Sequence, residues 1–401
     1  MLDLNILIIT PRIPYPPYRG DKLKIYNISK HLSRNNSVKV LTFLRNNNQL
    51  NDLEKIENLG VKIEAVKLSV IQSLLNIVGA VFSNIPFQVA WFKSNKMKEK
   101  INDEISKANY DAVYFHLIRS AQYLDLNKKN EKSLRVLDFT DAVSLYLSRF
   151  SKIEKNPLKK LFIKIEEKRV SAYEKIAEKF NTVFICSDID KEYLKEQGLN
   201  ANIKILNNGI DIDYFKADNI KFEENRIIFT GNMPYYANYD AAIYFAKKIF
   251  PLVLNEIPDS TFYIVGQKPP NRVRMLNSKN IIVTGFVPDI KKEYLKSAVN
   301  VAPIRFGAGT LNKVIESIAL GVPVVATPQA VGGLPKILKK YVFIANNHEE
   351  FAHFVVKILK TPSLRDQLMK EGELVIREML SWEKIVKNFE RDIEEGIINL
   401  N

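Results

Sequence analysis

The sequence has little cysteine and little histidine, with one cysteine, Cys186, and four histidines in 401 residues. A single cysteine excludes an internal disulfide framework and a cysteine-based zinc cluster, and it is typical of proteins in a reducing compartment. The histidines are not spaced as metal ligands; they are His31, His116, His348 and His353. We therefore expect no bound metal and no resident cofactor.

Acidic residues are fewer than basic ones, 45 against 59, which gives a formal net charge of +14. A charge of this size predicts affinity for anionic partners, such as phosphorylated ligands, a membrane surface or nucleic acid. The lysines are spread along the chain rather than interleaved with aromatic residues, and no nucleic-acid motif accompanies them. Phosphate ligands and an anionic membrane are therefore the expected partners, and nucleic acid is not.

The N-terminal stretch lacks the features of a secretory signal, because it contains Asp3 and its apolar run is short. We expect a cytoplasmic protein. The longest apolar segment covers residues 71–92 and is interrupted by Gly79, Pro86 and several amides. These interruptions make a membrane-spanning helix an unfavoured interpretation. Two interpretations stay open: a buried core helix, or an apolar face that rests on the inner face of the cell membrane.

The chain is too long for one ordinary hydrophobic core, so two domains are expected. Its hydrophobic content of 46% and charged content of 26% are those of a globular protein.

The most informative stretch covers residues 299–327 and reads VNVAPIRFGAGTLNKVIESIALGVPVVAT. An apolar run ends in a loop that contains Gly307 and Gly309, and an amphipathic segment follows over residues 312–320. Gly321 ends that segment, and a second apolar run begins. This order predicts a strand, a glycine loop, a helix and a second strand.

A helix that begins in such a loop directs its free N–H groups and positive dipole end toward an anion. Lys313 lies in the first helical turn, where a cation is unfavourable unless negative charge comes from a ligand. Glu316 lies on the same helical face, three residues later. The pair suits a nucleotide or a sugar phosphate, although a plain connection within a parallel α/β fold is the simpler alternative.

The second half of this stretch resembles the donor-sugar signature of family 4 glycosyltransferases, which are retaining enzymes of the GT-B fold. The matching residues are Glu316, Ala319, Gly321, Pro323, Val324 and Val325. The family has a further glutamate eight residues before Glu316, where this chain has Ala308. The GAGT-x-N-K form is similar to a bacterial subgroup associated with exopolysaccharide and exosortase-type systems.

The resemblance implies an α/β protein of the GT-B fold, with two doubly wound Rossmann-like domains facing a central cleft. Asn208, Gly209 and Asp211 match the family turn at the domain boundary. Residues 1–207 are then the acceptor-side domain, completed by a C-terminal crossover helix over residues 381–401. Residues 208–380 are the donor-binding domain.

The resemblance also implies which residues bind the nucleotide-sugar donor. Asn232 stands where relatives carry an arginine, and the lysine that follows in those relatives is missing. We hypothesise that Lys313 supplies the lost charge and that Glu316 holds the ribose hydroxyls. The expected donor-binding residues are Gly20, Gly231, Asn232, Gly266, Gly285, Val287, Gly307, Gly309, Thr310, Leu311, Asn312, Lys313 and Glu316.

Three residues are candidates in the first domain. His116 follows the apolar run of residues 110–115, where ligands of doubly wound sheets bind. We expect it to act with Lys313 and Glu316 in catalysis, and a structural histidine is the alternative. Asp141 and Lys22 are acceptor-side candidates, and an N-terminal helix cap is the simpler explanation of Asp141.

A basic helix is expected over residues 155–169, where lysines recur at helical spacing. It could bind anionic lipid or a lipid-linked acceptor, or it could be a solvated helix face. The sequence as a whole therefore predicts a metal-independent glycosyltransferase that passes a sugar from a nucleotide-diphosphate donor to a lipid-linked or polysaccharide acceptor, with retention. The alternatives are a nucleotide-sugar epimerase of the same fold and a noncatalytic scaffold of a polysaccharide assembly complex.

Overall fold

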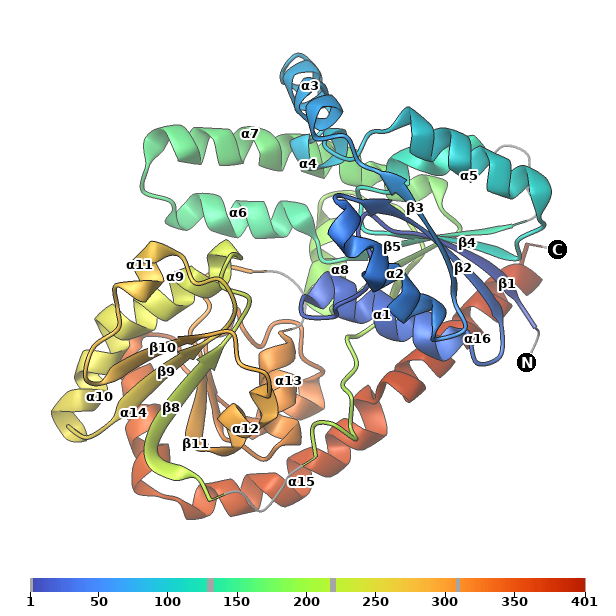
Figure 1. Cartoon of the computed structure of the whole chain (residues 1–401). Helices are drawn as coiled ribbons and strands as arrows, with labels where there is room; N and C mark the ends of the chain where they lie inside the picture. The colour runs from blue at the N-terminus through green and yellow to red at the C-terminus, as the bar shows by residue number, and fades with distance from the viewer. Residues whose placement is uncertain (1–2, 128–132, 217–220, 308–310, 401) are drawn as a thin grey trace. The chain divides into compact units, whose positions relative to one another are not determined.

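The chain folds into two α/β units (Figure 1). The first contains Met1–Asn207 and Trp382–Asn401, and the second contains Asn208–Ser381. The computed structural model describes residues 3–127, 133–216, 221–307 and 311–400, with the backbone alone at residues 125–127 and 365–370.

The first unit is built on a parallel seven-stranded sheet with the strand order β3-β2-β1-β4-β5-β6-β7. Near-continuous apolar runs form these strands because both faces of the sheet are covered by helices. The strands are β1 (Asn5–Ile9), β2 (Ser37–Leu44), β3 (Lys62–Lys67), β4 (Ala112–His116), β5 (Leu134–Thr140), β6 (Thr182–Ile185) and β7 (Ile203–Ile205).

The helices of this unit come from both ends of the chain, because α16 follows the second unit in sequence. The α-helices are α1 (Gly20–Leu32), α2 (Leu50–Glu57), α3 (Val70–Val81), α4 (Phe87–Ala90), α5 (Asn95–Lys107), α6 (Val143–Ile153), α7 (Pro157–Glu174), α8 (Asp188–Glu196) and α16 (Trp382–Ile398). Short 3-10 segments are Asn47–Gln49, Ala121–Asn127 and Lys175–Lys179.

The two faces of the first sheet have separate cores. Phe115 belongs to a buried cluster that includes Met97 and Ile101 of α5. The neighbouring residue of β4, Tyr114, points to the opposite face, since successive side chains of a strand alternate. There its ring packs edge-on against Phe389 of α16, with centroids 5.4 Å apart.

The second unit has a parallel six-stranded sheet with the order β10-β9-β8-β11-β12-β13. Its strands are β8 (Glu223–Thr230), β9 (Thr261–Val265), β10 (Ile281–Gly285), β11 (Ser297–Ala302), β12 (Val324–Ala326) and β13 (Val342–Ile344). Its helices are α9 (Tyr236–Tyr244), a π segment (Phe245–Ile249), α10 (Phe250–Glu256), α11 (Asn271–Arg274), α12 (Ile290–Leu295), α13 (Asn312–Ala319), a 3-10 segment (Lys336–Tyr341), α14 (His348–Lys360) and α15 (Ser363–Leu380).

Side-chain caps fix several helix starts. A Ser or Asn accepts a hydrogen bond from the backbone N–H three residues later, which satisfies one of the free donors of the first turn. The capping residues are Ser69 of α3, Ser94 of α5, Asn156 of α7, Ser187 of α8 and Asn347 of α14.

One expectation for a helix was wrong in detail. Gly79 does not interrupt its helix, because α3 is continuous from Val70 to Val81. A second helix changes geometry along its length: α9 is followed by π geometry at Phe245–Ile249. Pro251 explains the change, because it has no N–H for an ordinary helical bond and its ring crowds the preceding turn.

Candidate functional site

Each sheet has one point where the chain reverses its direction of travel across the sheet. In the first unit this point lies between β1 and β4, and in the second it lies between β8 and β11. Ligands of doubly wound folds bind outside the carboxyl ends of the strands at such points. His116 is the last residue of β4, and Lys313 lies on the helix after β11.

His116 is buried at the first of these points. Its Nδ1 lies 3.0 Å from the hydroxyl of Thr10, which follows β1. Burial lowers the pKa of His116 to about 4, although Asp138 opposes the shift. The ring is therefore neutral near pH 7, and its Nε2 has no hydrogen-bond partner among the described residues. A neutral imidazole of this kind is able to accept a proton or a hydrogen bond.

A buried ion pair lies beneath this histidine. The ammonium of Lys24 is 2.9 Å from Asp138, and both side chains are fully buried. Tyr114 donates a hydrogen bond to the same carboxylate oxygen, and Lys24 also donates to the other one at 3.1 Å. Burial opposes ionisation of Asp138, but the Lys24 charge and the hydrogen bonds from Tyr114 and Lys24 are among the causes that together lower the pKa of the carboxyl. Lys24 could not be predicted from the sequence, because a lysine inside an amphipathic helix gives no signal that it is buried.

Three arginines surround one carboxylate beside His116. Asp21 accepts from Arg12 at 2.5 Å and from Arg19 at 3.1 Å. Half-buried Arg119 has a pKa lowered to about 9, first by burial and then by the charge of Arg12. Positive charge therefore exceeds negative charge at this strand end, which suits an anion. The sequence contained a signal for this basic cluster, because Arg12 follows β1 and Arg119 follows β4 within three residues.

The other candidates of the first unit have structural partners. Gly20 is the first residue of α1, and the ammonium of Lys22 donates to the carbonyl oxygen of Tyr15 at 2.9 Å. Asp141 is not a helix cap, because α6 begins after Ala142 without a side-chain cap. Its carboxylate instead accepts from the thiol of Cys186 at 3.2 Å. Burial and the nearby carboxylate of Asp190 raise the pKa of Asp141.

In the second unit the predicted glycines lie side by side at three strand ends. Gly231 donates to the carbonyl oxygen of Val265 at 3.0 Å, and Gly266 donates to that of Gly285 at 3.0 Å. A Cβ at Gly266 would lie 1.8 Å from the carbonyl oxygen of Gly231, so only glycine fits. These loops therefore hold their backbones in close contact.

Asn238 of α9 connects this glycine row to Lys313. Its amide nitrogen donates to the carbonyl oxygen of Asn232 at 3.0 Å, and its amide oxygen accepts from the Lys313 ammonium at 2.8 Å. A Cβ at Gly231 would lie 2.8 Å from the Asn238 side chain, which explains the glycine there. Asn238 was missed from the sequence, because nothing in an isolated Asn indicates contact with two distant loops.

Lys313 is a buried cation bound to a neutral group. Its side chain is 7% exposed, and its ammonium lies 4.2 Å from the centre of the Phe229 ring. Burial lowers its pKa to about 7, although the charge of Glu316 opposes the shift. Because the Lys313 ammonium is bound to a neutral amide and a ring, it is able to form an ion pair with a bound anion.

Glu316 is half-buried one turn further along α13. It accepts from the Tyr294 hydroxyl at 3.0 Å, and that hydroxyl lies 2.6 Å from the hydroxyl of Thr230. Burial raises the pKa of Glu316 to about 6, and the hydrogen bond from Tyr294 opposes the shift. Tyr294 and Thr230 were not predicted as part of the site.

The remaining donor-side candidates are spread around α13. Asn312 accepts from Asn208 at 3.0 Å, and Leu311 precedes the helix without capping it. Val287 packs against a buried cluster that contains Tyr294. Gly307 is the last residue described before the loop, and Ala308, Gly309 and Thr310 lie outside the described residues.

A cation near this site was also missed. Arg305 follows β11 and makes a two-point contact with Asp240, with distances of 3.0 and 2.5 Å. Its position directly after an apolar run was a usable sequence signal. In the described part of the chain, no group of three His, Cys, Asp or Glu side chains is arranged to hold a metal ion.

Comparison with known protein families identifies the second unit. Residues 224–361 match the family model described as glycosyl transferases group 1. The matched region lies within the second unit and resembles a group 1 glycosyltransferase domain. The match contains both Lys313 and Glu316, together with Asn238 and the three glycines at the strand ends. The whole chain is also 23% identical over 380 residues to an uncharacterized 44.6 kDa protein in the cps region of Klebsiella pneumoniae, covering 90% of this chain and 92% of that protein.

Solved structures place the group 1 domain within a known two-unit fold. Sucrose-phosphate synthase from Thermosynechococcus elongatus is 15% identical, with a TM-score of 0.71 and 98% of each chain covered. Anabaena HepE in complex with UDP-glucose is 12% identical, with a TM-score of 0.68, covering 98% of this chain and 100% of HepE. TarM has a TM-score of 0.63 at 14% identity, covering 98% of this chain and 99% of TarM. The GT-B fold expected from the sequence is therefore confirmed.

Proposed function

We propose that this chain is a retaining, metal-independent glycosyltransferase of family 4. It moves a sugar from a nucleotide-diphosphate donor to a lipid-linked or polysaccharide acceptor in bacterial cell-surface or exopolysaccharide synthesis. The observation that carries the proposal is Lys313, a buried ammonium held by Asn238 at the start of α13 in a group 1 glycosyltransferase domain. The relative in the cps region and the UDP-glucose complex of HepE support the pathway and the donor class.

The donor diphosphate would bind where the N–H groups of α13 and the Lys313 charge act together. Charge on the departing diphosphate grows as the bond to the sugar breaks, so a fixed cation and helix end stabilise the transition state more than the ground state. Glu316 would accept from donor hydroxyls in place of Tyr294. His116 is neutral, and its Nε2 has no hydrogen-bond partner among the described residues. It would accept a hydrogen bond or a proton from the sugar or from the acceptor hydroxyl.

A binding panel tests the donor site. The purified protein is heated with nucleotide-diphosphate sugars and free nucleotides, since a ligand at 100 times its Kd adds about 2.7 kcal/mol to stability. We expect one donor to raise Tm. Lys313→Met and Glu316→Gln should weaken its binding on the order of tenfold or more. Lys247→Met is the matched control, because Lys247 is an exposed lysine of the same unit.

The pH dependence of donor affinity separates a direct phosphate contact from a structural role. Because the pKa of Lys313 is about 7, the free protein loses this charge as the pH rises above neutrality. Affinity for the diphosphate should then fall with rising pH in the parent and stay level in Lys313→Met. If both proteins show the same profile, Lys313 does not contact the phosphates.

Products distinguish the proposed activity from its alternatives. Transfer to a second molecule with an unchanged anomeric configuration, in the presence of a chelator, is the expected outcome. Conversion of the donor sugar without transfer would indicate an epimerase. Absence of any nucleotide-dependent Tm shift in the folded protein would contradict catalysis and favour a scaffold.

A further inference from the structure

Exposed apolar side chains are concentrated on two helices of the first unit. Half of the large hydrophobic residues that are exposed in the described part of the chain lie on α3, just after it, or on α7. Phe82 is 88% exposed and Ile71 is 74% exposed. We call this surface the α3–α7 face. It consists of Val70, Ile71, Leu74, Leu75, Val78, Val81, Phe82, Ile85, Leu158, Leu161, Phe162 and Ile165.

Helices α3 and α7 belong to the first unit, where Figure 1 draws them with α4. Side-chain contacts join these elements. The ring of Phe87 in α4 stacks on Phe162 of α7, with centroids 5.4 Å apart and planes 4° apart. Arg169 of α7 donates to the carbonyl oxygen of Val81 at 3.1 Å and lies over the Phe87 ring at 4.7 Å. The α3–α7 face is therefore one fixed surface rather than two separate ones.

The orientation of α3 is the reverse of that expected for a helix covering a core. Its buried residues are Ser73 and Ala80, while its large side chains point outward. Ser73 donates to the carbonyl oxygen of Trp91 at 2.7 Å, and Asn76 donates to that of Lys93 at 2.9 Å. The small and polar side of the helix thus holds it to the protein, and its apolar side is left for a partner.

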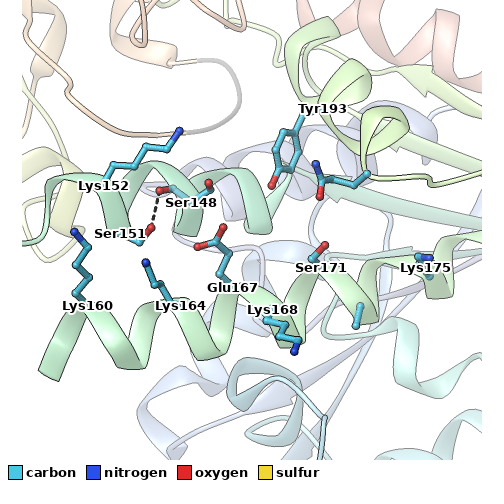
Figure 2. A pocket seen from close by; sticks show the side chains of 12 residues that line it. Ser148, Ser151, Lys152, Lys160, Lys164, Glu167, Lys168, Ser171, Lys175 and Tyr193 are labelled. Atoms are coloured by element: carbon cyan, nitrogen blue, oxygen red, sulfur yellow. Dashed lines mark hydrogen bonds between the residues drawn. The ribbon is translucent and has the colours of Figure 1, made fainter. Parts of the chain in front are cut away.

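Lysines border the α3–α7 face. Lys164 and Lys168 lie beside Leu161 on the surface of α7, at spacings of three and seven residues. They also line an open groove of about 760 Å³ between α6 and α7, with Lys152, Lys160 and Lys175. Figure 2 shows Lys160 and Lys164 extending from α7 toward α6. Glu167 is the one carboxylate in this lining, so the groove is strongly basic.

The charges beside the α3–α7 face and the length of α3 indicate which partner this face binds. A second copy of the chain would bring its own lysines to the same contact, and like charges would repel. Residues 68–92 contain no charged side chain, so nothing on α3 opposes contact with acyl chains. The helix has 12 residues, which is about 18 Å, whereas a bilayer core is about 30 Å thick. In the described part of the chain, every helix is too short or too polar to cross a bilayer.

We propose that the α3–α7 face binds the surface of an anionic lipid bilayer. The apolar side chains enter the boundary between headgroups and acyl chains, and the lysines of α7 and of the groove contact anionic headgroups. This binding is independent of the proposed glycosyl transfer, because neither Lys313 nor His116 takes part in it.

Vesicle flotation tests the proposal with the full chain. Vesicles of phosphatidylcholine are compared with vesicles that also contain phosphatidylglycerol. The parent should partition at least about tenfold more strongly onto the anionic vesicles, and added salt should weaken binding. Two double variants, Ile71→Ser with Phe82→Ser and Lys164→Glu with Lys168→Glu, should each lose about tenfold or more.

Matched controls change the same residue types elsewhere. Met275→Ser removes an equally exposed apolar side chain from the second unit, and Lys247→Glu with Lys248→Glu reverses two exposed lysines there. Both controls should bind vesicles as the parent does. All variants change exposed side chains, so their Tm values should match that of the parent.

Two outcomes would overturn the proposal. In one, the parent fails to float with anionic vesicles at low salt, or the variants of the face float as well as the controls. In the other, the parent is a dimer in solution, the variants are monomers, and vesicle binding is unchanged. The latter result would make the α3–α7 face an interface between copies.

Discussion

At the residue scale, burial of the charged forms of Lys313 and Glu316 lowers the stability of the folded protein. Transfer of an ammonium from water to a buried site costs free energy unless an opposite charge replaces the water. Lys313 receives an amide oxygen and an aromatic ring instead. The pKa of Lys313 is lowered and that of Glu316 is raised, so burial penalises the charged form of both. A site of this kind is typical of a ligand-binding role rather than a stabilising one.

The pH dependence of stability provides a direct measurement of this cost. In the unfolded chain Lys313 keeps its proton up to an ordinary pKa of 10.5, whereas the folded chain releases it near pH 7. Because the unfolded state binds more protons in this window, rising pH stabilises the parent relative to Lys313→Met. The difference in unfolding free energy should change by about 1.4 kcal/mol per pH unit.

Urea unfolding at about pH 7.5 and about pH 9 measures this slope, since all other groups cancel in the comparison of parent and variant. Lys247→Met serves as the control and should show no slope relative to the parent. A constant difference between Lys313→Met and the parent would mean that Lys313 titrates at its ordinary pKa.

At the element scale, the packing of strand ends depends on glycine. A methyl group at Gly266 would overlap the carbonyl oxygen of Gly231, and backbone atoms cannot move aside as a flexible side chain can. Gly266→Ala should therefore destabilise the second unit by about 2 kcal/mol or more. It should also weaken donor binding, because the displaced loop carries Asn232 and the contact to Asn238.

Gly79→Ala is the matched control. Gly79 lies inside α3, and a Cβ there meets no atom within 4 Å. Alanine should stabilise this helix by about 0.5–1 kcal/mol, since glycine loses more backbone entropy. Thermal or urea unfolding compares the two variants. Equal stability of Gly266→Ala and the parent would show that the strand ends can separate without cost.

The sequence predicted elements better than it predicted contacts between them. Apolar runs and glycine stops placed β11, α13 and β12, because these signals are local. Lys313 and Glu316 could be selected because they lie on one helix. Asn238, Tyr294 and Lys24 could not, since their partners are distant in sequence and meet only when separate elements pack. The sequence also left the exposure of α3 undecided, because an apolar run has the same pattern whether it is buried in the core or faces a partner.

At the scale of the whole molecule, the chain order differs from the division into units. Helix α16 follows the second unit in sequence but belongs to the first. Its Phe389 packs against Tyr114 and Phe184 of the first sheet, with ring centroids 5.4 and 5.0 Å apart. In addition, Glu390 accepts from Asn36 at 2.6 Å. The first unit therefore cannot complete its core until α16 has been synthesised, after the whole of the second unit.

Hydrogen exchange of the full chain tests whether α16 stabilises the first unit alone. Phe389→Ala should cost about 3–5 kcal/mol, because it leaves a cavity among aromatic rings. Amide protection should fall in β4, β5 and β6, which lie on the side of the cavity, and stay at the parental level in β8 and β9.

Phe262→Ala is the matched control, because Phe262 is fully buried against Phe245 in the second unit. In Phe262→Ala, amide protection should fall in β8 and β9 and stay at the parental level in β4, β5 and β6. If either variant lowers protection equally in both sheets, the two units unfold together, and α16 stabilises the entire molecule rather than the sheet it covers.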